Sequence, residues 1–535
     1  MIGKFISVRK SKLRTIMRGY RKLKQSGNLG KIAEIKRVLT NTPIIDGKGA
    51  NTSVIFGSGS SNAELVIRQY LLIRVAGIGL NKALLYAEGN YNSKIIYPLP
   101  SEWRFVLKQY GFNIAVIRSS LMWYGYSLLL LSYGCMSFIK EFSKELLSKI
   151  KQKPPELIGK YVYFNALQKE NLPTELKGRQ SHDIFSWYYE NMGHVDTLCH
   201  SIKGAEPNII QKSPIIYTES PVPPLLHSQK LIRFLAWGFI AITISFIDLF
   251  RGKWWNAIML HESVLAARTR IQRPDKLAKD YMFHNSNWIY RPLWTYEAEK
   301  SGARILFYFY STNIERILKS DGSKNINYGW QACNWPNILV WDNGQEDFIR
   351  NDIGNSSSKI SVVGPIWFSA SKQKLDDLPP KAMAIFDVQP VRNSLYQTLG
   401  LDFEYYIPII AKQFLLDIYA ILNANDIAMA LKRKRKVGSL AHPEYRNLTE
   451  SLEKKPNYIS INPDVAAPDV IEECFAVISA PYTSTALLAR AQGKPSAYYD
   501  PFSQCQKGDP AAHGIEILSG KKELEKWVNQ LVEAM

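Results

Sequence analysis

The sequence contains little cysteine, and its cysteines are widely scattered. Five occur in 535 residues, and none forms the CxxC pair of a zinc site or a redox centre. An odd number of widely spaced cysteines excludes a disulfide framework and favours a reducing compartment. The N-terminal segment is positively charged but has no continuous apolar core or small-residue cleavage site, so we expect no secretory signal peptide.

Several common site motifs are also missing. No Asp-x-Asp occurs, which removes the usual signature of enzymes that bind a diphosphate donor through a metal, and we expect no metal site. The stretch "GSGSSNAE" at 57–64 lacks the spacing of a GxGxxG fingerprint or a P-loop. We interpret it as a strand-to-helix turn, with a flexible acceptor loop as the alternative. No internal repeat of about 20 to 50 residues stands out, which argues against a solenoid or a propeller.

Acidic residues are scarce at the N-terminal end. Residues 1–40 hold twelve Lys or Arg and one acid, Glu34, so this segment carries +11 of the net charge of +20. Between the bases, apolar residues recur mostly at three- and four-residue steps, which predicts a basic amphipathic helix. It either binds anionic phospholipid or packs, solvated, on the protein. A nucleic-acid arm is less favoured because no recognisable nucleic-acid module follows it, so we expect no nucleic-acid partner.

Long apolar runs are few. The run 119–139 is uncharged for 21 residues but includes five serines and two glycines, and 234–247 is uncharged for 14 residues. The first is long enough to cross a bilayer and the second is short for it. We interpret the first as a buried or interfacial helix. Together with the basic segment, these runs predict a peripheral protein bound to an anionic membrane surface.

Length and pattern predict an α/β protein of two Rossmann-like domains. A chain of 535 residues is longer than a single hydrophobic core normally organises, which favours two or more domains. From about residue 52, beginning with "TSVIF", short apolar runs that predict strands alternate with longer helical patterns. We expect the basic segment at 1–45, an N-terminal Rossmann-like acceptor domain at 46–320 with helical insertions, and a C-terminal nucleotide-sugar-binding domain at 321–535. "ARILFYFYST" would be the last strand of the first half, and 151–225 would be linking structure.

A hydroxyl cluster follows one apolar strand of the second half. After "CFAVISA" come Pro481 and Tyr482, and then Thr483, Ser484 and Thr485 begin an Ala/Leu-rich helix. One such hydroxyl would be enough to cap the helix. Because a helix N-terminus attracts anions and open α/β sheets bind ligands at the carboxyl ends of their strands, three hydroxyls there favour a phosphate site.

A cationic strand and a histidine loop lie upstream in "ALKRKRKVGSLAHPEY". Strand alternation would place Lys432 and Lys434 on one face. His442 is followed by Pro443, which restricts it to an extended backbone and suits a fixed phosphate donor. Two further residues, Asp387 and Arg392, follow the strand in "AIFDVQPVRN" and would face the cleft.

These motifs resemble those of known transferases. The His-Pro pair and the Ser/Thr cluster are similar to those of GT-B glycosyltransferases that use CMP-activated acidic sugars, such as sialyl and Kdo transferases. "VVGPIWF", "IFDVQPVR" and "FHNSNWIYRPLWTYEAEKSGARILFYFYSTN" resemble a family of bacterial surface-carbohydrate biosynthesis proteins, over about residues 255–510. The resemblance implies a GT-B fold, a CMP-sugar of the nonulosonic acid or Kdo type as co-substrate without a further cofactor, and a glycan acceptor, possibly lipid-linked. It also implies work at the inner face of the bacterial cytoplasmic membrane.

The implied reaction has two needs. Fixed donors must neutralise the departing phosphate, for which we select the following residues: Lys432, Lys434, His442, Pro443, Thr483, Ser484, Thr485, Arg392 and Asp387. An inverting enzyme also needs a base in the first domain, chosen among His261, Glu262, His284 and Glu297. We select Glu297 first and Glu262 second; the acidic-acidic-Gly motif that holds the base of sialyltransferases is not evident.

Two other functions stay open. His-Pro loops also occur in polyol-phosphate transferases that use CDP-linked donors. The chain would otherwise be a non-catalytic protein that binds membranes or nucleic acids.

Overall fold

In the computed structural model, the described residues are 2–28, 30–45, 51–90, 93–151, 160–167, 171–172, 183–204, 208–210, 212–284, 290–311, 317–318, 322, 324–325, 330, 333–354, 357–366, 375–392, 397, 406–438 and 440–535.

The C-terminal domain contains a six-stranded parallel sheet. The sheet strands are β11 (Ala382–Phe386), β12 (Ala428–Lys432), β13 (Tyr458–Ile461), β14 (Ala476–Ser479), β15 (Ser496–Asp500) and β16 (Glu516–Ser519). Their spatial order, β13-β12-β11-β14-β15-β16, is the 3-2-1-4-5-6 order of a Rossmann sheet.

Helices cover both faces of this sheet because its central strands are buried on both sides. One face packs on α14 (Pro408–Ala424), α15 (Pro443–Leu452) and α18 (Lys521–Glu533). The other packs on α16 (Ala467–Glu473) and α17 (Ser484–Ala491). The expected strands in "AIFDVQPVRN" and "CFAVISA" are confirmed as β11 and β14, and the Ala/Leu-rich helix is confirmed as α17. The cationic strand is shorter than expected, because β12 ends at Lys432.

The first domain has an eight-stranded sheet with the same central order. Its strands are β1 (Tyr161–Phe164), β2 (Thr197–His200), β3 (Asn208–Ile210), β4 (Ser213–Tyr217), β5 (Asp280–His284), β6 (Arg304–Tyr308), β9 (Asn337–Val340) and β10 (Lys359–Val362). They lie in the order β10-β9-β6-β5-β1-β2-β4-β3, with only β3 antiparallel. Two Rossmann-like sheets in one chain confirm the expected α/β architecture. The smaller elements are α8 (Ile184–Met192), α11 (Trp294–Lys300), α12 (Asn343–Asp347) and the pair β7 (Ile317–Leu318) and β8 (Lys324–Asn325).

Two boundaries of the expected organisation are wrong. The domain division at 320/321 is too early, because β9 pairs with β6 in the first sheet and β10 pairs with β9. The first strand of the second sheet begins only at Ala382. The segment 151–225 is not linking structure, because it supplies β1 to β4. Short strands separated by polar loops look like a linker in sequence, and only their pairing shows that they form a sheet.

The N-terminal part is helical rather than α/β. Its helices are α1 (Ile2–Gln25), α2 (Lys31–Asn41), α3 (Thr52–Phe56), η1 (Gly57–Asn62), α4 (Ala63–Arg74), α5 (Ile78–Gly89) and α6 (Ser101–Gln109). The expected strand "TSVIF" is α3, and 93–115 contributes only an isolated bridge between Ile95 and Ile114. The predicted basic helix is confirmed as α1, which crosses α5 closely where Gly19 faces Gly89.

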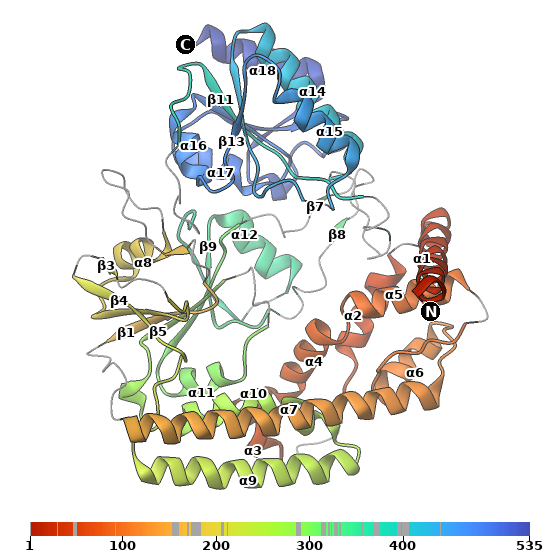
Figure 1. Ribbon diagram of the computed structural model, residues 1–535, viewed down its shortest axis with the longest axis vertical. Helices are drawn as coiled ribbons and strands as arrows, with labels where there is room; N and C mark the ends of the chain where they lie inside the picture. Colours follow the sequence, from red (N-terminus) through yellow and green to blue (C-terminus); the bar gives the residue numbers. More distant parts are fainter. Residues whose placement is uncertain are drawn as a thin grey trace.

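Three long helices underlie the first domain. They are α7 (Val116–Lys151), α9 (Ser228–Phe250) and α10 (Trp254–Ile271), which pack on one another. Figure 1 shows α7 and α9 side by side along the lower edge of the molecule, below the first sheet, with the C-terminal domain at the opposite end. By length and composition, α9 is long and apolar enough to cross a membrane, which alone is weak evidence for a span.

Candidate functional site

Three adjacent strands of the second sheet end at the same level. Phe386 of β11 is paired with Lys432 of β12 on one side and with Ser479 of β14 on the other. The loops that follow therefore leave the sheet together at its carboxyl edge. Two backbone links hold them there: His442 N donates to Pro390 O (3.0 Å), and Ala480 N donates to Phe386 O (2.7 Å).

His442 lies at this edge with one ring nitrogen unused. It is the N-cap residue of α15, and Pro443 is the first helical residue, where a missing amide hydrogen costs nothing. Its Nδ1 is buried and has no hydrogen-bond partner among the described residues. A buried polar atom without a partner is uncommon in folded proteins. Here it leaves the imidazole available for a bound group.

The hydroxyl cluster begins α17 at the same edge. Thr483 is the N-cap residue, yet its Oγ1 donates to Ala480 O (2.7 Å) and does not cap the helix. Thr485 Oγ1 lies 2.8 Å from Ser479 Oγ and is likewise engaged. The first-turn amides of α17 therefore have no side-chain cap, and they present the partial positive charge of a helix N-terminus.

A rigid turn holds this cluster in place. Tyr482 is buried with a φ of 62°, a conformation that costs a non-glycine residue roughly 1 to 3 kcal/mol. Two phenols hold its neighbours: Tyr498 donates to Thr483 O (2.9 Å) and Tyr406 donates to Pro481 O (3.0 Å). The turn is thus fixed before any ligand binds.

Asp387 positions the histidine loop. Its Oδ2 accepts a hydrogen bond from the Tyr445 hydroxyl, which joins the end of β11 to the first turn of α15. Burial raises the pKa of Asp387 to about 6, although the Tyr445 hydrogen bond and the charge of Arg433 act in the opposite direction. This bond ties the Asp387 carboxylate to the protein's own helix.

The three predicted cations differ in position. Lys432 is buried, and its Nζ donates to Arg433 O (3.0 Å) and Pro463 O (3.2 Å). These bonds lie within the second domain, so the Lys432 ammonium stabilises the fold there. Burial lowers the pKa of Lys432 to about 8. Lys434 and Arg392 are exposed at the carboxyl edge. Arg392 follows Val391, which bridges Ala441 in the histidine loop. The expectation that Lys432 and Lys434 share one strand face is wrong.

The two domains meet at their carboxyl edges. Lys434 Nζ lies 5.9 Å from the centre of the Tyr310 ring, two residues beyond the end of β6. Tyr310 in turn contacts His284, the last residue of β5, with ring centres 6.0 Å apart. The sequence analysis did not select Tyr310, because it belongs to the aromatic stretch "FYFY" at the end of a strand, and such a stretch is typical of a hydrophobic core.

A second contact joins the domains through a histidine. His513 Nδ1 lies 2.8 Å from Asp342 Oδ1, beyond the end of β9, and the His513 side chain is fully buried. Burial raises the pKa of Asp342, but its hydrogen bond and charge interaction with His513 outweigh burial and lower it. This pair holds α12 against the second domain.

Glu297 does not lie at the facing edges. It belongs to α11, which precedes β6, so it lies near the amino end of that strand. Tyr310 follows the carboxyl end of the same strand, so the two residues lie at opposite ends of it. Its carboxylate is buried and accepts from Ser58 N (2.9 Å) and Ser58 Oγ (2.6 Å). Glu297 was selected because it precedes a strand that approaches the cleft, but the structure places it at the far end of that strand from the cleft. The interpretation of "GSGSSNAE" as a strand-to-helix turn is wrong, because residues 57–62 form the 3-10 helix η1 between α3 and α4. Its use as an acceptor loop stays a prediction.

Glu262 also makes contacts within the first domain. It lies within α10, and its carboxylate accepts hydrogen bonds from the Tyr290 hydroxyl and from Leu293 N (3.4 Å). These bonds fix Tyr290 and Leu293, just before α11, against α10. Its use as a base stays a prediction.

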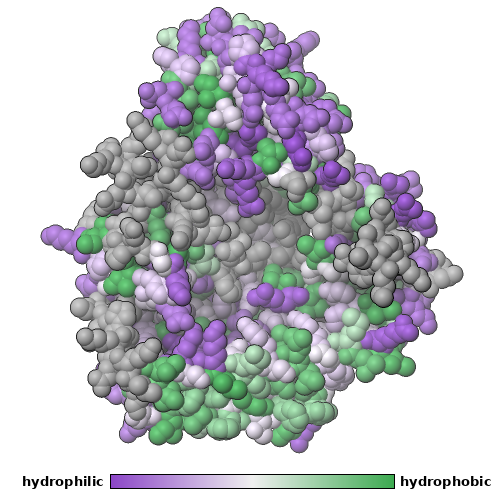
Figure 2. Space-filling model, in the orientation of Figure 1, coloured by the Kyte–Doolittle hydropathy of each residue, from purple (hydrophilic) through white to green (hydrophobic). Residues whose placement is uncertain are grey.

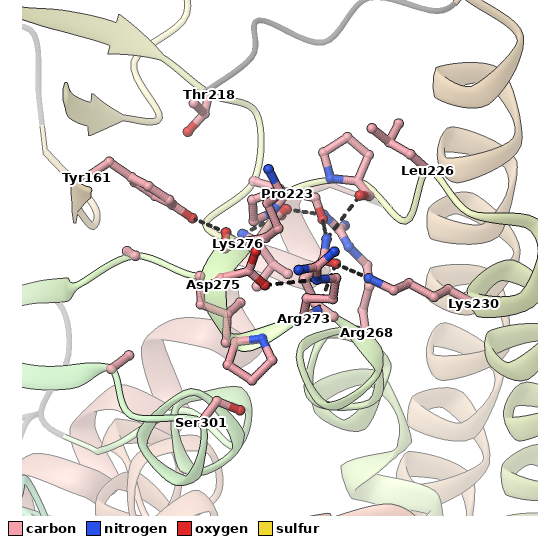
Figure 3. A pocket seen from close by; sticks show the side chains of 18 of the residues that line it. Tyr161, Thr218, Pro223, Leu226, Lys230, Arg268, Arg273, Asp275, Lys276 and Ser301 are labelled. Carbon is pink, nitrogen blue, oxygen red and sulfur yellow. Dashed lines mark hydrogen bonds and ion pairs between the residues drawn. The ribbon is translucent and has the colours of Figure 1, made fainter. Parts of the chain in front are cut away.

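A cavity of about 1700 Å³ in the first domain lies away from this site. It is bordered by the amino ends of β1 and β5 and by parts of α7, α9 and α10. Figure 3 shows Lys230, Arg268, Arg273 and Lys276 pointing into it. Arg268 pairs with Glu141 (2.6 Å) and Arg273 with Asp275 (3.0 Å). Because both arginines are already paired with carboxylates, the cavity is a poorer candidate for the phosphate site than the carboxyl edge of the second sheet.

Within the described ranges, no group of three His, Cys, Asp or Glu side chains is arranged to hold a metal ion.

A profile of polysaccharide biosynthesis PFTS motif proteins matches residues 237–528, more than half of the chain. The chain belongs to this family. The matched span includes β5 to β16 and so contains the whole carboxyl-edge site. No relative was found among curated proteins.

Several solved structures are similar at low identity. The UDP-GlcNAc 2-epimerase from Methanocaldococcus jannaschii is 10% identical with a TM-score of 0.36, over 69% of this chain and 91% of the other. The wall teichoic acid polymerase TagF is 12% identical with a TM-score of 0.34, over 70% and 78%. The calicheamicin glycosyltransferase CalG4 is 9% identical with a TM-score of 0.30, over 69% and 89%. These TM-scores are low, and the fold rests on the strand orders of the two sheets.

Proposed function

We propose that this protein is a glycosyltransferase of bacterial surface-polysaccharide assembly, with an acidic sugar carried on CMP as donor. The observation that carries the proposal is the unpartnered, buried Nδ1 of His442 at the same sheet edge as the uncapped start of α17. Membership in a polysaccharide biosynthesis family supports the pathway. The CMP donor rests on the similarity of the His-Pro loop and the Ser/Thr cluster to those of CMP-sugar transferases.

The proposed chemistry is neutralisation of a departing phosphate. As the bond between the anomeric carbon and the CMP oxygen breaks, negative charge grows on the phosphate. His442 and the α17 amides are fixed donors that need no rearrangement at that moment, which is the most effective form of electrostatic catalysis. Arg392 and Lys434 add positive charge at the rim. Asp387 and Tyr445 act as positioning residues, since they hold His442 through α15.

The proposed acceptor is a growing glycan, in lipid-linked form, at the cytoplasmic face of the cytoplasmic membrane. The basic helix α1 supports this location, because Lys12, Arg14 and Arg18 are exposed on it. Anionic lipid attracts such side chains by about 1 kcal/mol each.

A donor screen tests the function. Purified protein is incubated with CMP-linked acidic sugars and with CDP-glycerol, with and without EDTA, and CMP release is measured. We expect release from a CMP-linked acidic sugar that EDTA does not abolish. Release from CDP-glycerol alone would instead establish the polyol-phosphate alternative. Release from neither donor, with vesicle binding that His442→Ala leaves unchanged, would favour a non-catalytic membrane protein.

A further inference from the structure

Two helices expose large apolar side chains on one side of the molecule. On α7 the outward residues include Leu121, Leu129 and Met136, and on α9 they include Phe239, Phe246 and Phe250, which are between 50% and 74% exposed. We call the exposed sides of α7 and α9 the platform face. Figure 2 shows apolar surface concentrated along the lower edge of the molecule, where Figure 1 places these helices. A soluble surface rarely exposes a contiguous apolar patch of this extent.

The opposite sides of the same helices belong to the protein core. Phe234 and Ala241 of α9 are fully buried, and Gly238 lies against the Phe138 ring of α7. Asp248 is also fully buried and accepts from the Asn256 side chain of α10 (2.8 Å). If α9 crossed a bilayer as a separate helix, Asp248 would lose these partners in hydrocarbon, at a cost of several kcal/mol. The helix therefore lies along the protein.

The charges of these two helices are sorted by sign. The exposed charged residues described on α7 and α9 are Arg118, Lys140 and Arg233, all basic. The acids point inward: Glu145 and Asp248 are buried, and Glu141 is paired with Arg268 of α10. Between Arg118 and Lys140 no charged residue interrupts α7. An apolar face edged by bases and, over its described residues, free of exposed acids is complementary to an anionic lipid interface.

We propose that the platform face binds an anionic phospholipid bilayer, with α7 and α9 lying in the plane of the interface. At about 1.5 Å per residue, the 36 residues of α7 extend roughly 54 Å along the membrane. Long basic side chains at the edges reach the headgroups while their stems stay apolar. A second copy of this chain fits less well, since the described part of the face offers no acid to meet Arg118, Lys140 and Arg233 of the other copy.

The basic helix α1 has a different role in this arrangement. Ile16, Tyr20 and Leu23 of its apolar side are buried in the protein, whereas Leu13 is 44% exposed. The exposed bases of α1 attract anionic lipid by charge, and the platform face supplies the larger apolar surface for insertion. The inference extends the proposed membrane location by naming the surface that binds.

Vesicle binding by the full-length chain tests the inference. The double variant Phe239→Asp/Phe246→Asp is compared with wild type and with Ile409→Asp, which places one such charge on an exposed apolar site of the second domain. Vesicles of phosphatidylethanolamine and phosphatidylglycerol are used at low and high salt, with phosphatidylcholine vesicles as reference. We expect the double variant to lose vesicle affinity by roughly tenfold or more at both salt levels, because two inserted Phe side chains are lost. The Ile409→Asp control should bind as wild type.

Each other outcome has a definite meaning. If wild type does not bind the anionic vesicles, or if the double variant binds as well as the control, the proposal is overturned. A solution dimer that the double variant dissociates, without vesicle binding by wild type, would assign the face to a second copy instead. If the double variant does not fold, Phe250→Asp at the end of α9 replaces it. Vesicle binding needs neither donor nor acceptor, so its failure would leave the transferase proposal standing.

Discussion

The two domains share the central strand order of their sheets, but the polar groups of His442 and Glu297 lie at opposite edges of those sheets. In the second domain, the carboxyl edge holds the unpartnered Nδ1 of His442 and the uncapped start of α17. In the first domain, the buried Glu297 lies near the amino edge and is fully engaged by Ser58. A polar group with partners stabilises the fold, whereas one without partners is available to a ligand.

Whether a buried polar group already has hydrogen-bond partners distinguishes a functional residue from a structural one better than its residue type does. A carboxylate in a sequence looks catalytic whether or not its oxygens are already used. The contrast between His442 and Glu297 predicts that replacement of the first removes activity and replacement of the second removes stability. The following experiments test that contrast.

The largest effect is expected from His442→Ala. Loss of a fixed donor to a developing oxyanion typically lowers kcat by about 100- to 1000-fold. We therefore expect CMP release to fall by that order while thermal unfolding stays near wild type. His194→Ala, at an exposed histidine of the first domain, is the matched control and should keep full activity. Activity near wild type in His442→Ala would contradict the assignment of the site.

Glu297→Ala is expected to act on stability. Its removal leaves the buried Ser58 amide without an acceptor, at a cost of about 1 to 3 kcal/mol in the free energy of unfolding. Denaturant unfolding measures this loss, and kcat per folded molecule should change little. Glu297→Gln keeps an acceptor and should recover part of the stability. A fully stable Glu297→Gln protein without turnover would show instead that this residue is the base.

Asp387→Asn is expected to have a pH-dependent effect. The folded pKa of about 6 lies above the ordinary 3.8, so the folded state holds an extra proton between these values. The carboxyl thus costs stability when ionised above about pH 6, and this cost, on the order of 3 kcal/mol, disappears as the pH falls toward 4. Asp387→Asn should therefore be more stable than wild type near pH 8 and no more stable near pH 4. Denaturant unfolding of both proteins at pH 8 and pH 4 measures the difference in the free energy of unfolding and so checks its sign.

The smallest effect is expected from His513→Gln at the domain contact. This change weakens the link to Asp342, so the two domains should open without unfolding. Small-angle scattering would show a larger radius of gyration, and the KM for the donor should rise more than kcat falls. Because the pKa of Asp342 is lowered from 3.8, its stabilising contribution is complete above about pH 4 and is lost only as the pH falls further. An unchanged scattering profile would show that other contacts hold the domains together.

Local pattern located β11, β12 and β14 of the second domain, because each follows an apolar run. It also located β6 of the first domain within "ARILFYFYST", but it missed β1 to β4. In the first domain "TSVIF" has the composition of a strand but forms α3. The strands β1 to β4 are short and separated by polar segments, and they are stabilised by partners far away in the sequence.

The sequence by itself determined the residues with the right chemistry: the imidazole, the three hydroxyls, the basic α1 and the apolar runs of α7 and α9. Only the tertiary structure decided which of them have partners. It buried the apolar side of α1, turned the platform face outward and gave both Glu297 oxygens to Ser58. The physical reason is that a hydrogen bond or an apolar contact between residues distant in the chain depends on the packing of whole elements, which no local spacing encodes.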